Sequence, residues 1–564
     1  MFYIIKIKKF LDIKYNNLKI LKKYYIIYIK LKNKKFLLSK RSQREKGEKS
    51  MNKFLNGLTD ATNFALTENG AITHKTTKSD LLDMFALGGA YRNRSDADVI
   101  LLFKNAYKEN PVYALKCLFY LRDVRGGQGE RRFFRVAMKW LANSDVAAAK
   151  RNLKYVAEFG RWDDLYLFVN TALEKDAFEF MKNQLALDMQ CKTPSLLAKW
   201  LKSENTSSME SRLLAKKTRQ YFGMTAKQYR KTLSILRERI NVLERLMSAG
   251  KWDEIEFDKI PSKAGLIYKN AFARHDIERM KNDATIQSYA DFAKDTTKTV
   301  NAKALYPYEV VDKAIRLMGY NSGWFRKNSS NIPLDNTDRL MINKYWDNLA
   351  DYINEATFNG IAVVDTSGSM TGGTADAPIN VAVSLGMYCA TKNQGPFKDH
   401  FITFESSPHM VKVEGVDFCD KVHRITGADW GGSTNIEAVF DLLLDTAIRN
   451  NCSQDEIPQN VIIISDMEFN SCVTTFSYGR MYGNKVNTLF EDMAEKWKRN
   501  GYEMPKLTFW NVDARQNNIP MTSDGNVNYV SGMSPVIFEQ VLKGLTAFDL
   551  MMSKLNEPRY EVIH

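Results

Sequence analysis

The sequence predicts a multidomain protein: an all-α helical-repeat (HEAT-like) domain followed by a doubly wound (Rossmann-like) α/β domain. From Asp80 to about Tyr320, apolar residues recur at three- and four-residue spacing, which is typical of helices. After about Gly360, short apolar strands alternate with helices, which favours a parallel sheet covered on both faces. We therefore expect a basic extension at 1–50, the helical domain at 51–355 and the α/β domain at 356–564.

Most of the net charge of +16 lies in the first tenth of the 564-residue chain. Residues 1–50 hold 16 Lys and Arg against 3 Asp and Glu, whereas 51–358 carry a net +12 and 359–564 a net −9. No uncharged run in 1–50 approaches the roughly 20 residues of a membrane span. We expect this extension to be disordered or absent from the native protein, with translation beginning at Met51. The alternative is a basic amphipathic segment on an anionic membrane surface.

Helix punctuation supports the assignment of the basic half. Ser95 to Asp98 resembles a capping box, Pro111 can open a helix, and the glycines at 126, 127 and 129 interrupt the chain. The hexapeptide at 160–165 (GRWDDL) is echoed at 250–255 (GKWDEI), where an Asp could cap the following helix. This echo fits stacked helix pairs with a concave binding face.

Two stretches of this half concentrate arginine and lysine, at 121–135 and 211–245. Arginine binds phosphate oxygens through two parallel hydrogen bonds, and Tyr221, Phe222 and Tyr229 could stack on unpaired bases. The alternative is that these are merely solvated helix faces and that Phe133, Phe134 and the tyrosines belong to the core. The candidate RNA-binding residues are Arg122, Arg125, Arg131, Arg132, Arg135, Lys216, Lys217, Arg219, Lys227, Arg230, Lys231 and Arg237.

The acidic half alternates strands and helices. Ligands of such sheets bind beyond the carboxyl ends of the strands, and three loops expected there carry oxygen-bearing side chains. The strands are expected at 361–365, 400–404, 461–465 and 507–512, and the helices at 379–392, 435–449, 488–500 and 534–544. The three loops are DTSGS at 365–369, GGSTN at 431–435 and SDME at 465–468.

This order of residues resembles the metal-ion-dependent adhesion site of von Willebrand factor A domains. The resemblance implies that Asp365, Ser367, Ser369, Thr434 and Asp466 are metal ligands, directly or through water. Two carboxylates and three hydroxyls suit Mg²⁺ or Mn²⁺, with a position left for a carboxylate from a protein partner. The alternative is a polar turn between strand and helix with capping side chains.

The combination of the two halves is similar to the Ro autoantigen family, which joins a helical (TROVE-type) ring to an A domain. It is closer to an uncharacterised two-domain family of plants, fungi, bacteria and phages. The latter resemblance rests on LRDVRGGQGERRFFR (121–135), FGRWDDL (159–165), LLAKWLKSENTSS (196–208), KIPSKA (259–264) and LYPYEVV (305–311). The Ro resemblance implies binding of small structured or misfolded RNAs.

We therefore predict a non-enzymatic, cytoplasmic RNA-binding protein with a metal-dependent A domain. The six cysteines are scattered without a Cys-x-x-Cys pair, which fits a reducing compartment and argues against a zinc ribbon. The six histidines lack zinc-hydrolase spacing, and no nucleophile with an adjacent base is evident near the metal residues. The alternative is a metal-dependent protein scaffold without RNA binding, and a metal-dependent nuclease is the least favoured.

Overall fold

The computed structural model describes most of the chain from residue 63 onward. The described ranges are 63–67, 72–281, 283, 285–320, 334–353, 358–372, 374–404, 407–427, 435–468, 489–517, 519, 527–542 and 545–564. The expectations for residues 1–50 and for Met51 lie outside the described residues. Within the described ranges, no helix has the length and apolar character needed to cross a membrane.

The N-terminal half is helical, as predicted, after a short antiparallel hairpin of β1 (Phe64–Leu66) and β2 (Ile72–His74) that the sequence analysis missed. The helices are α3 (Asp80–Leu87), α4 (Asp96–Glu109), α5 (Pro111–Arg122), α6 (Arg132–Ser144), α7 (Val146–Asn152), α8 (Tyr155–Phe159), α9 (Glu174–Gln190), α10 (Leu197–Trp200), α11 (Met209–Phe222), α12 (Ala226–Arg239), α13 (Leu243–Ser248), α14 (Ser262–Arg274), α15 (Asp276–Met280), α16 (Tyr289–Lys294), α17 (Pro307–Leu317) and α18 (Asn336–Asp347). Short 3₁₀ helices are η1 (Gly88–Asn93), η2 (Trp162–Phe168) and η3 (Phe257–Lys259).

Local sequence explains several helix starts. Ser95 and Asp98 form a capping box at α4, and Pro111 is the first residue of α5, as predicted. The two related hexapeptides behave differently: the first leads into η2, whereas the second enters turns before η3. The hexapeptide echo therefore does not mark two equivalent helix starts.

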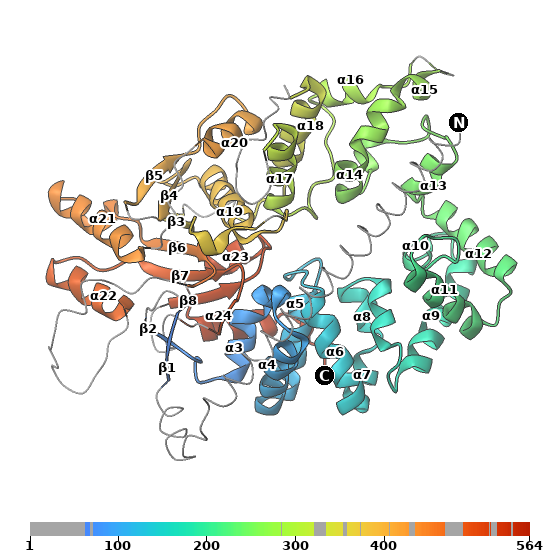
Figure 1. Cartoon of the computed structure of the whole chain (residues 1–564), viewed down its shortest axis with the longest axis horizontal. Coiled ribbons are helices and arrows are strands. Elements are labelled where there is room, and N and C mark those ends of the chain that lie inside the picture. Colours follow the sequence, from blue (N-terminus) through green and yellow to red (C-terminus); the bar gives the residue numbers. More distant parts are fainter. Residues whose placement is uncertain are drawn as a thin grey trace, which may run out of the picture. The chain divides into compact units, whose positions relative to one another are not determined.

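The C-terminal half is an α/β domain around a six-stranded sheet of order β5-β4-β3-β6-β7-β8, parallel except for β5 (Figure 1). Strands β5 and β8 were not predicted. The strands are β3 (Gly360–Asp365), β4 (His400–Phe404), β5 (His409–Lys412), β6 (Asn460–Ser465), β7 (Lys506–Asn511) and β8 (Val527–Ser531). The helices are α19 (Pro378–Lys392), α20 (Phe418–Thr426), α21 (Ile436–Arg449), α22 (Leu489–Arg499), α23 (Ile537–Val541) and α24 (Ala547–Leu555).

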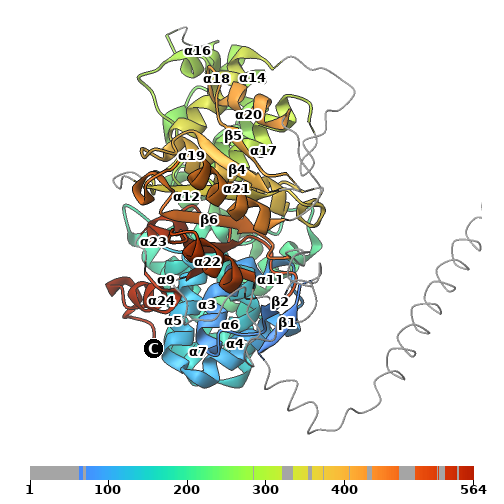
Figure 2. The same ribbon diagram turned by 90° about the vertical axis from the view of Figure 1, so that its left-hand side faces the viewer.

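Strand order reverses between β3 and β6. From β3 the chain crosses to β4 through α19, whereas the later crossovers through α21 and α22 run toward β6 and β7. Right-handed crossovers therefore place α19 on one face and α21 with α22 on the other, and the latter two lie in front of the sheet in Figure 2. The carboxyl ends of β3 and β6 flank this reversal, which is where ligands of such sheets bind.

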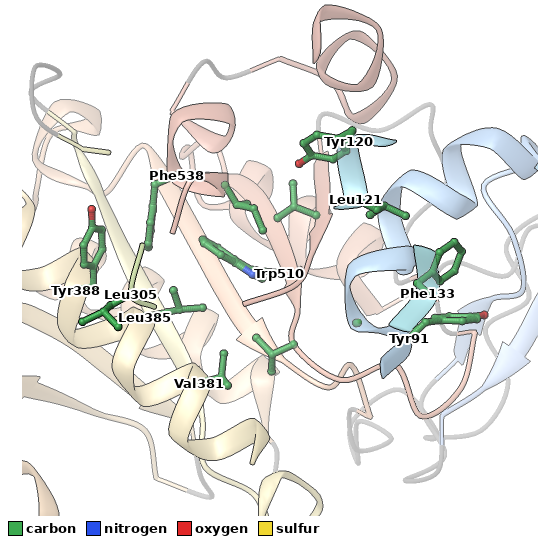
Figure 3. Packing of buried hydrophobic residues seen from close by; sticks show 14 of the residues in the cluster. Tyr91, Tyr120, Leu121, Phe133, Leu305, Val381, Leu385, Tyr388, Trp510 and Phe538 are labelled. Atoms are coloured by element: carbon green, nitrogen blue, oxygen red, sulfur yellow. The ribbon is translucent and has the colours of Figure 1, made fainter. Parts of the chain in front are cut away.

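The two halves share one hydrophobic core (Figure 3). Trp510 of β7 packs against Phe538 of α23 with ring centroids 4.8 Å apart, and Phe538 stacks on Tyr388 of α19 at 5.4 Å. On the helical side, Tyr120 of α5 accepts a hydrogen bond from Gln540 of α23 at 2.9 Å. Because these contacts are buried, the α/β domain and the start of the helical region stabilise each other.

Both ends of the helical region contact the α/β domain (Figure 1). Near its start, Arg559, beyond α24, pairs with the buried Asp123 through an Nη2 to Oδ1 hydrogen bond of 2.8 Å. At its end, Arg339 of α18 donates two hydrogen bonds to Asp417, at 2.7 and 2.9 Å, next to α20. The helices between these points are thus held at both ends by one sheet domain.

Candidate functional site

Asp365 is the last residue of β3 and is completely buried. Its carboxylate accepts a hydrogen bond from the Ser465 hydroxyl at 2.5 Å and one from the Ser367 backbone N–H at 2.9 Å. The hydroxyl oxygens of Ser367 and Ser369 lie 2.9 Å apart. The structure therefore brings three of the predicted metal-binding side chains together at the carboxyl edge of the sheet.

Asp466 follows β6, next to β3, and its side chain is also buried. Burial, followed by the negative charge of Asp365, raises the pKa of Asp466 to about 8. A hydrogen bond from Ser369 lowers this pKa but does not offset the rise. Its Oδ2 atom is buried and has no hydrogen-bond partner among the described residues, and Arg515 Nε lies 3.9 Å away. Burial likewise raises the pKa of Asp365.

This acidic pair, Asp365 and Asp466, fits a divalent cation. Two buried carboxylates that disfavour each other's charge, with one oxygen that accepts no hydrogen bond from a described residue, would gain from a bound Mg²⁺ or Mn²⁺. The ligand predicted at Thr434 lies outside the described residues. Among the described residues, no group of three or more His, Cys, Asp and Glu side chains converges, so any metal here depends on serine hydroxyls and water as well.

Two of the predicted RNA contacts belong to a buried ion-pair network instead. Arg122 is 2% exposed, and its Nε and Nη2 donate to Asp164 Oδ2 at 2.9 and 2.7 Å. Arg135 reaches the other oxygen of Asp164 at 2.6 Å and also pairs with Asp163 at 3.2 Å. The structure therefore gives Arg122 and Arg135 a structural role, because both guanidinium groups pair with Asp164, and their assignment to RNA stays a prediction.

Three residues of the second basic stretch also have internal partners. Lys217 pairs with Glu174 at 2.6 Å, and Arg219 pairs with Glu204 at 2.8 Å. Arg237 donates one hydrogen bond of 2.9 Å to the Ala198 backbone oxygen in α10, and two of 2.8 and 3.0 Å to the segment after α10. These three side chains hold helices together, which weakens their assignment to RNA.

The predicted stacking rings are mostly core residues. Phe222 and Tyr229 are buried, and Tyr221 stacks on Phe178 with ring centroids 4.4 Å apart. Phe222 and Tyr229 therefore cannot stack on a base, whereas Tyr221 is exposed and has one face covered by Phe178. The expectation that Phe133, Phe134 and the tyrosines belong to the core is therefore confirmed for Phe133, Phe134 and Tyr229, which are buried, but not for the exposed Tyr221.

The remaining candidates are exposed or line cavities. Lys216, Lys227, Arg230 and Lys231 are exposed and make no ion pair within the described part of the chain. Arg125 and Arg131 are also exposed and unpaired there, although Arg125 donates to the backbone oxygen of Glu158 at 2.5 Å. Arg132 is half-exposed and pairs with Asp96.

A cavity of about 930 Å³, which we call the helical groove, runs along α10 and α12 to α14. Its lining includes Lys199, Trp200, Arg230, Lys263 and Tyr268. The Arg161 guanidinium lies over the Trp200 ring at 4.0 Å from its centroid. The groove therefore combines cations with aromatic rings.

A second cavity of about 950 Å³, which we call the junction cavity, lies where the helical region meets the loop after β8. Arg125, Arg131 and Arg132 line its helical side, and residues 533–536 line its α/β side. Arg161, Lys263 and Ala304 line both cavities, so the groove and the junction cavity adjoin.

Several residues that line the cavities were not predicted. A count of Arg and Lys along the chain does not show which side chains meet in the folded protein. Lys199 and Trp200 lie in LLAKWLKSENTSS, Lys263 in KIPSKA, and Tyr306 and Tyr308 in LYPYEVV. Each of these motifs was noted for family resemblance alone. Only the folded structure shows that these residues line two adjoining cavities.

Comparisons with known proteins agree with this two-part organisation. Residues 67–196 and 186–357 match the family described as "Domain of unknown function (DUF2828)". The chain belongs to this family. Residues 359–559 match a second family, described as "Domain of unknown function (DUF7788)".

A relative of this DUF2828 protein occurs in Acanthamoeba polyphaga mimivirus, where it is called "Uncharacterized protein L728". The two are 30% identical over 523 residues, which is 85% of each chain. Among solved structures, the Ro (RSR) protein of Deinococcus radiodurans is similar at 11% identity and a TM-score of 0.40. That match covers 83% of this chain and 100% of the Ro chain.

Proposed function

We propose that the protein is a non-enzymatic RNA-binding protein of Ro-like type, with single-stranded RNA following the helical groove. The observation that carries this proposal is the groove itself, which is lined by the cations Lys199 and Arg230 and by the Trp200 and Tyr268 rings. Cations along a groove neutralise phosphates, and aromatic rings stack on unpaired bases without sequence preference.

The helical region acts in this proposal as a HEAT-like array, and the α/β domain as a von Willebrand factor A domain. Support for the latter is the acidic pair at the point of strand reversal, beside the Ser367 and Ser369 hydroxyls. A bound Mg²⁺ or Mn²⁺ would there take a carboxylate oxygen from a protein partner. We place the protein in the cytoplasm, in keeping with the free thiols of the described cysteines.

Binding of a fluorescent single-stranded RNA at about 50 and about 200 mM salt tests the RNA proposal. We expect binding to weaken steeply with salt, because phosphate contacts release counterions. The variant Lys199→Gln/Arg230→Gln should lower the slope of log affinity against log salt by about 1.4, or about 0.7 per lost contact. The matched control is Lys104→Gln/Lys108→Gln, which removes two exposed lysines of α4 that line neither cavity.

All variants contain the basic extension, which itself can bind RNA. The informative quantity is therefore the difference in salt slope between the variants. Equal salt slopes for the groove variant and the control would contradict RNA binding in the groove. No binding at the lower salt would contradict RNA binding altogether.

A second candidate function is metal-dependent protein binding without RNA, which the acidic pair favours. The variant Asp466→Asn tests whether RNA binding depends on the metal site. RNA affinity that is unchanged in this variant, with loss of Mg²⁺ binding by calorimetry, would support two independent sites. Loss of both RNA affinity and Mg²⁺ binding would show that RNA binding depends on the bound metal.

A further inference from the structure

The junction cavity carries a large excess of positive charge. Eight Arg and Lys side chains line it against two acidic ones, Glu130 and Asp376. Four of the eight are neutralised by carboxylates. Arg122 pairs with Asp164, Arg132 with Asp96, Arg161 with Asp163, and Lys263 with Glu309.

The other four, Arg92, Arg125, Arg131 and Lys303, form no ion pair with any described residue. Arg92 Nε is also buried without a hydrogen-bond partner there. Burial and the nearby charges of Arg135 and Arg161 lower the pKa of Arg131. This cavity thus holds four cations that form no ion pair with a described residue, and an anion would relieve their mutual repulsion.

Aromatic rings line the same cavity. Tyr306 and Tyr308 lie with their ring centroids 5.9 Å apart, and Tyr352 faces the cavity from the segment before β3. The Tyr306 hydroxyl donates to the Gln128 backbone oxygen at 2.9 Å. Because Gly129 has φ +68° and a Cβ there would meet the Tyr306 hydroxyl at 2.3 Å, the glycine turn is needed for this close contact.

The uncompensated cations and the rings fit a ligand that has both an anionic group and a flat base. A terminal phosphate monoester carries nearly two negative charges at pH 7, whereas an internal phosphodiester carries one. The cavity adjoins the helical groove through Arg161 and Lys263, so a strand lying in the groove can end in it. Its volume is at the upper end of the range typical of small-molecule sites.

We propose that the junction cavity binds the phosphate monoester of a terminal nucleotide, with Arg131 and Lys303 contacting the phosphate and Tyr308 and Tyr352 contacting the base. The inference rests on the proposed RNA function, because a bound RNA strand would supply the terminal nucleotide. A free nucleoside monophosphate presents the same chemistry and is the other source.

The test uses the full chain and one internally labelled 12-nucleotide RNA with three kinds of ends: all hydroxyl, 5′-phosphate and 3′-phosphate. One phosphorylated RNA should bind about tenfold more tightly than the hydroxyl form, because the ionised terminal phosphate accepts charge-assisted hydrogen bonds and an uncharged terminal hydroxyl does not. The variant Arg131→Gln/Lys303→Gln should reduce this preference to near parity. The control Lys104→Gln/Lys108→Gln should keep it.

Both altered side chains are exposed and unpaired among the described residues, so the variant should fold, as thermal unfolding can verify. RNA binding with no preference among the three ends would overturn the inference and leave the RNA function standing. Binding of AMP, lost in the Arg131→Gln/Lys303→Gln variant, without binding of any RNA would sustain the site and overturn the RNA function. Binding of neither would overturn both.

Discussion

Arg122 and Asp164 form a buried ion pair, in which one carboxylate oxygen accepts hydrogen bonds from Nε at 2.9 Å and Nη2 at 2.7 Å. Arg122→Gln should lower the free energy of unfolding by about 3 kcal/mol, because it leaves a buried carboxylate with less compensation. Urea unfolding measures this loss. The exposed Lys104→Gln should change stability by less than about 0.5 kcal/mol. If Arg122→Gln left the stability unchanged but abolished RNA affinity, Arg122 would be an RNA contact instead.

The acidic pair predicts stabilisation by divalent metal. At a free Mg²⁺ concentration of about 100 times the dissociation constant, the free energy of unfolding should rise by about 2.7 kcal/mol relative to EDTA. Asp466→Asn should abolish this rise, whereas Asp445→Asn, which alters an exposed acid of α21, should retain it. Calorimetric unfolding with and without Mg²⁺ provides the comparison. An equal Mg²⁺ effect in all three proteins would show that the metal binds elsewhere.

Burial of Asp83 in α3 predicts a pH dependence of stability. Burial raises its pKa to about 6, despite a 2.8 Å hydrogen bond from the Thr77 backbone N–H. The native state then holds a proton that the unfolded state releases at about pH 4, so this contribution to stability is lost as the pH rises from about 4 to about 6.

Asp83→Asn removes this titration and keeps an acceptor oxygen. The stability of the wild type minus that of Asp83→Asn should fall by about 2–3 kcal/mol between pH 4 and pH 7 in urea unfolding experiments. Parallel pH profiles for the two proteins would show that Asp83 has an ordinary pKa.

The shared core predicts that the two halves unfold together. Tyr560 donates to Asp123 at 3.2 Å beside the Arg559 pair, so the C-terminal segment supports the helical region directly. Asp123→Ala should lower the midpoint of a single thermal transition. Two separate calorimetric transitions in the wild type would contradict this coupling.

The sequence predicted the fold class because helix and strand periodicities are local. The expected strand at 461–465 differs by one residue from β6, and the capping box at Ser95 has the expected partners. It missed β8, whose alternating residues lie between segments without regular pattern, and the short edge strand β5. It could not identify the shared core, because contacts such as Tyr120 to Gln540 join residues 420 positions apart.

The candidate site was predictable where it is contiguous in sequence. Asp365, Ser367 and Ser369 fall in one loop, and strand topology alone brings Asp466 beside them. Arginine density was a poor guide, since Arg122 and Arg237 satisfy internal acceptors. Whether an arginine faces a carboxylate or a cavity depends on tertiary packing, which charge counting does not include.

The central claim is that RNA binds through the cavities of the helical region. Its most direct test is the salt dependence of single-stranded RNA binding by the wild type, Lys199→Gln/Arg230→Gln and Lys104→Gln/Lys108→Gln. We expect a slope lower by about 1.4 in the groove variant alone. Identical slopes in all three proteins, or no RNA binding at about 50 mM salt, would contradict it.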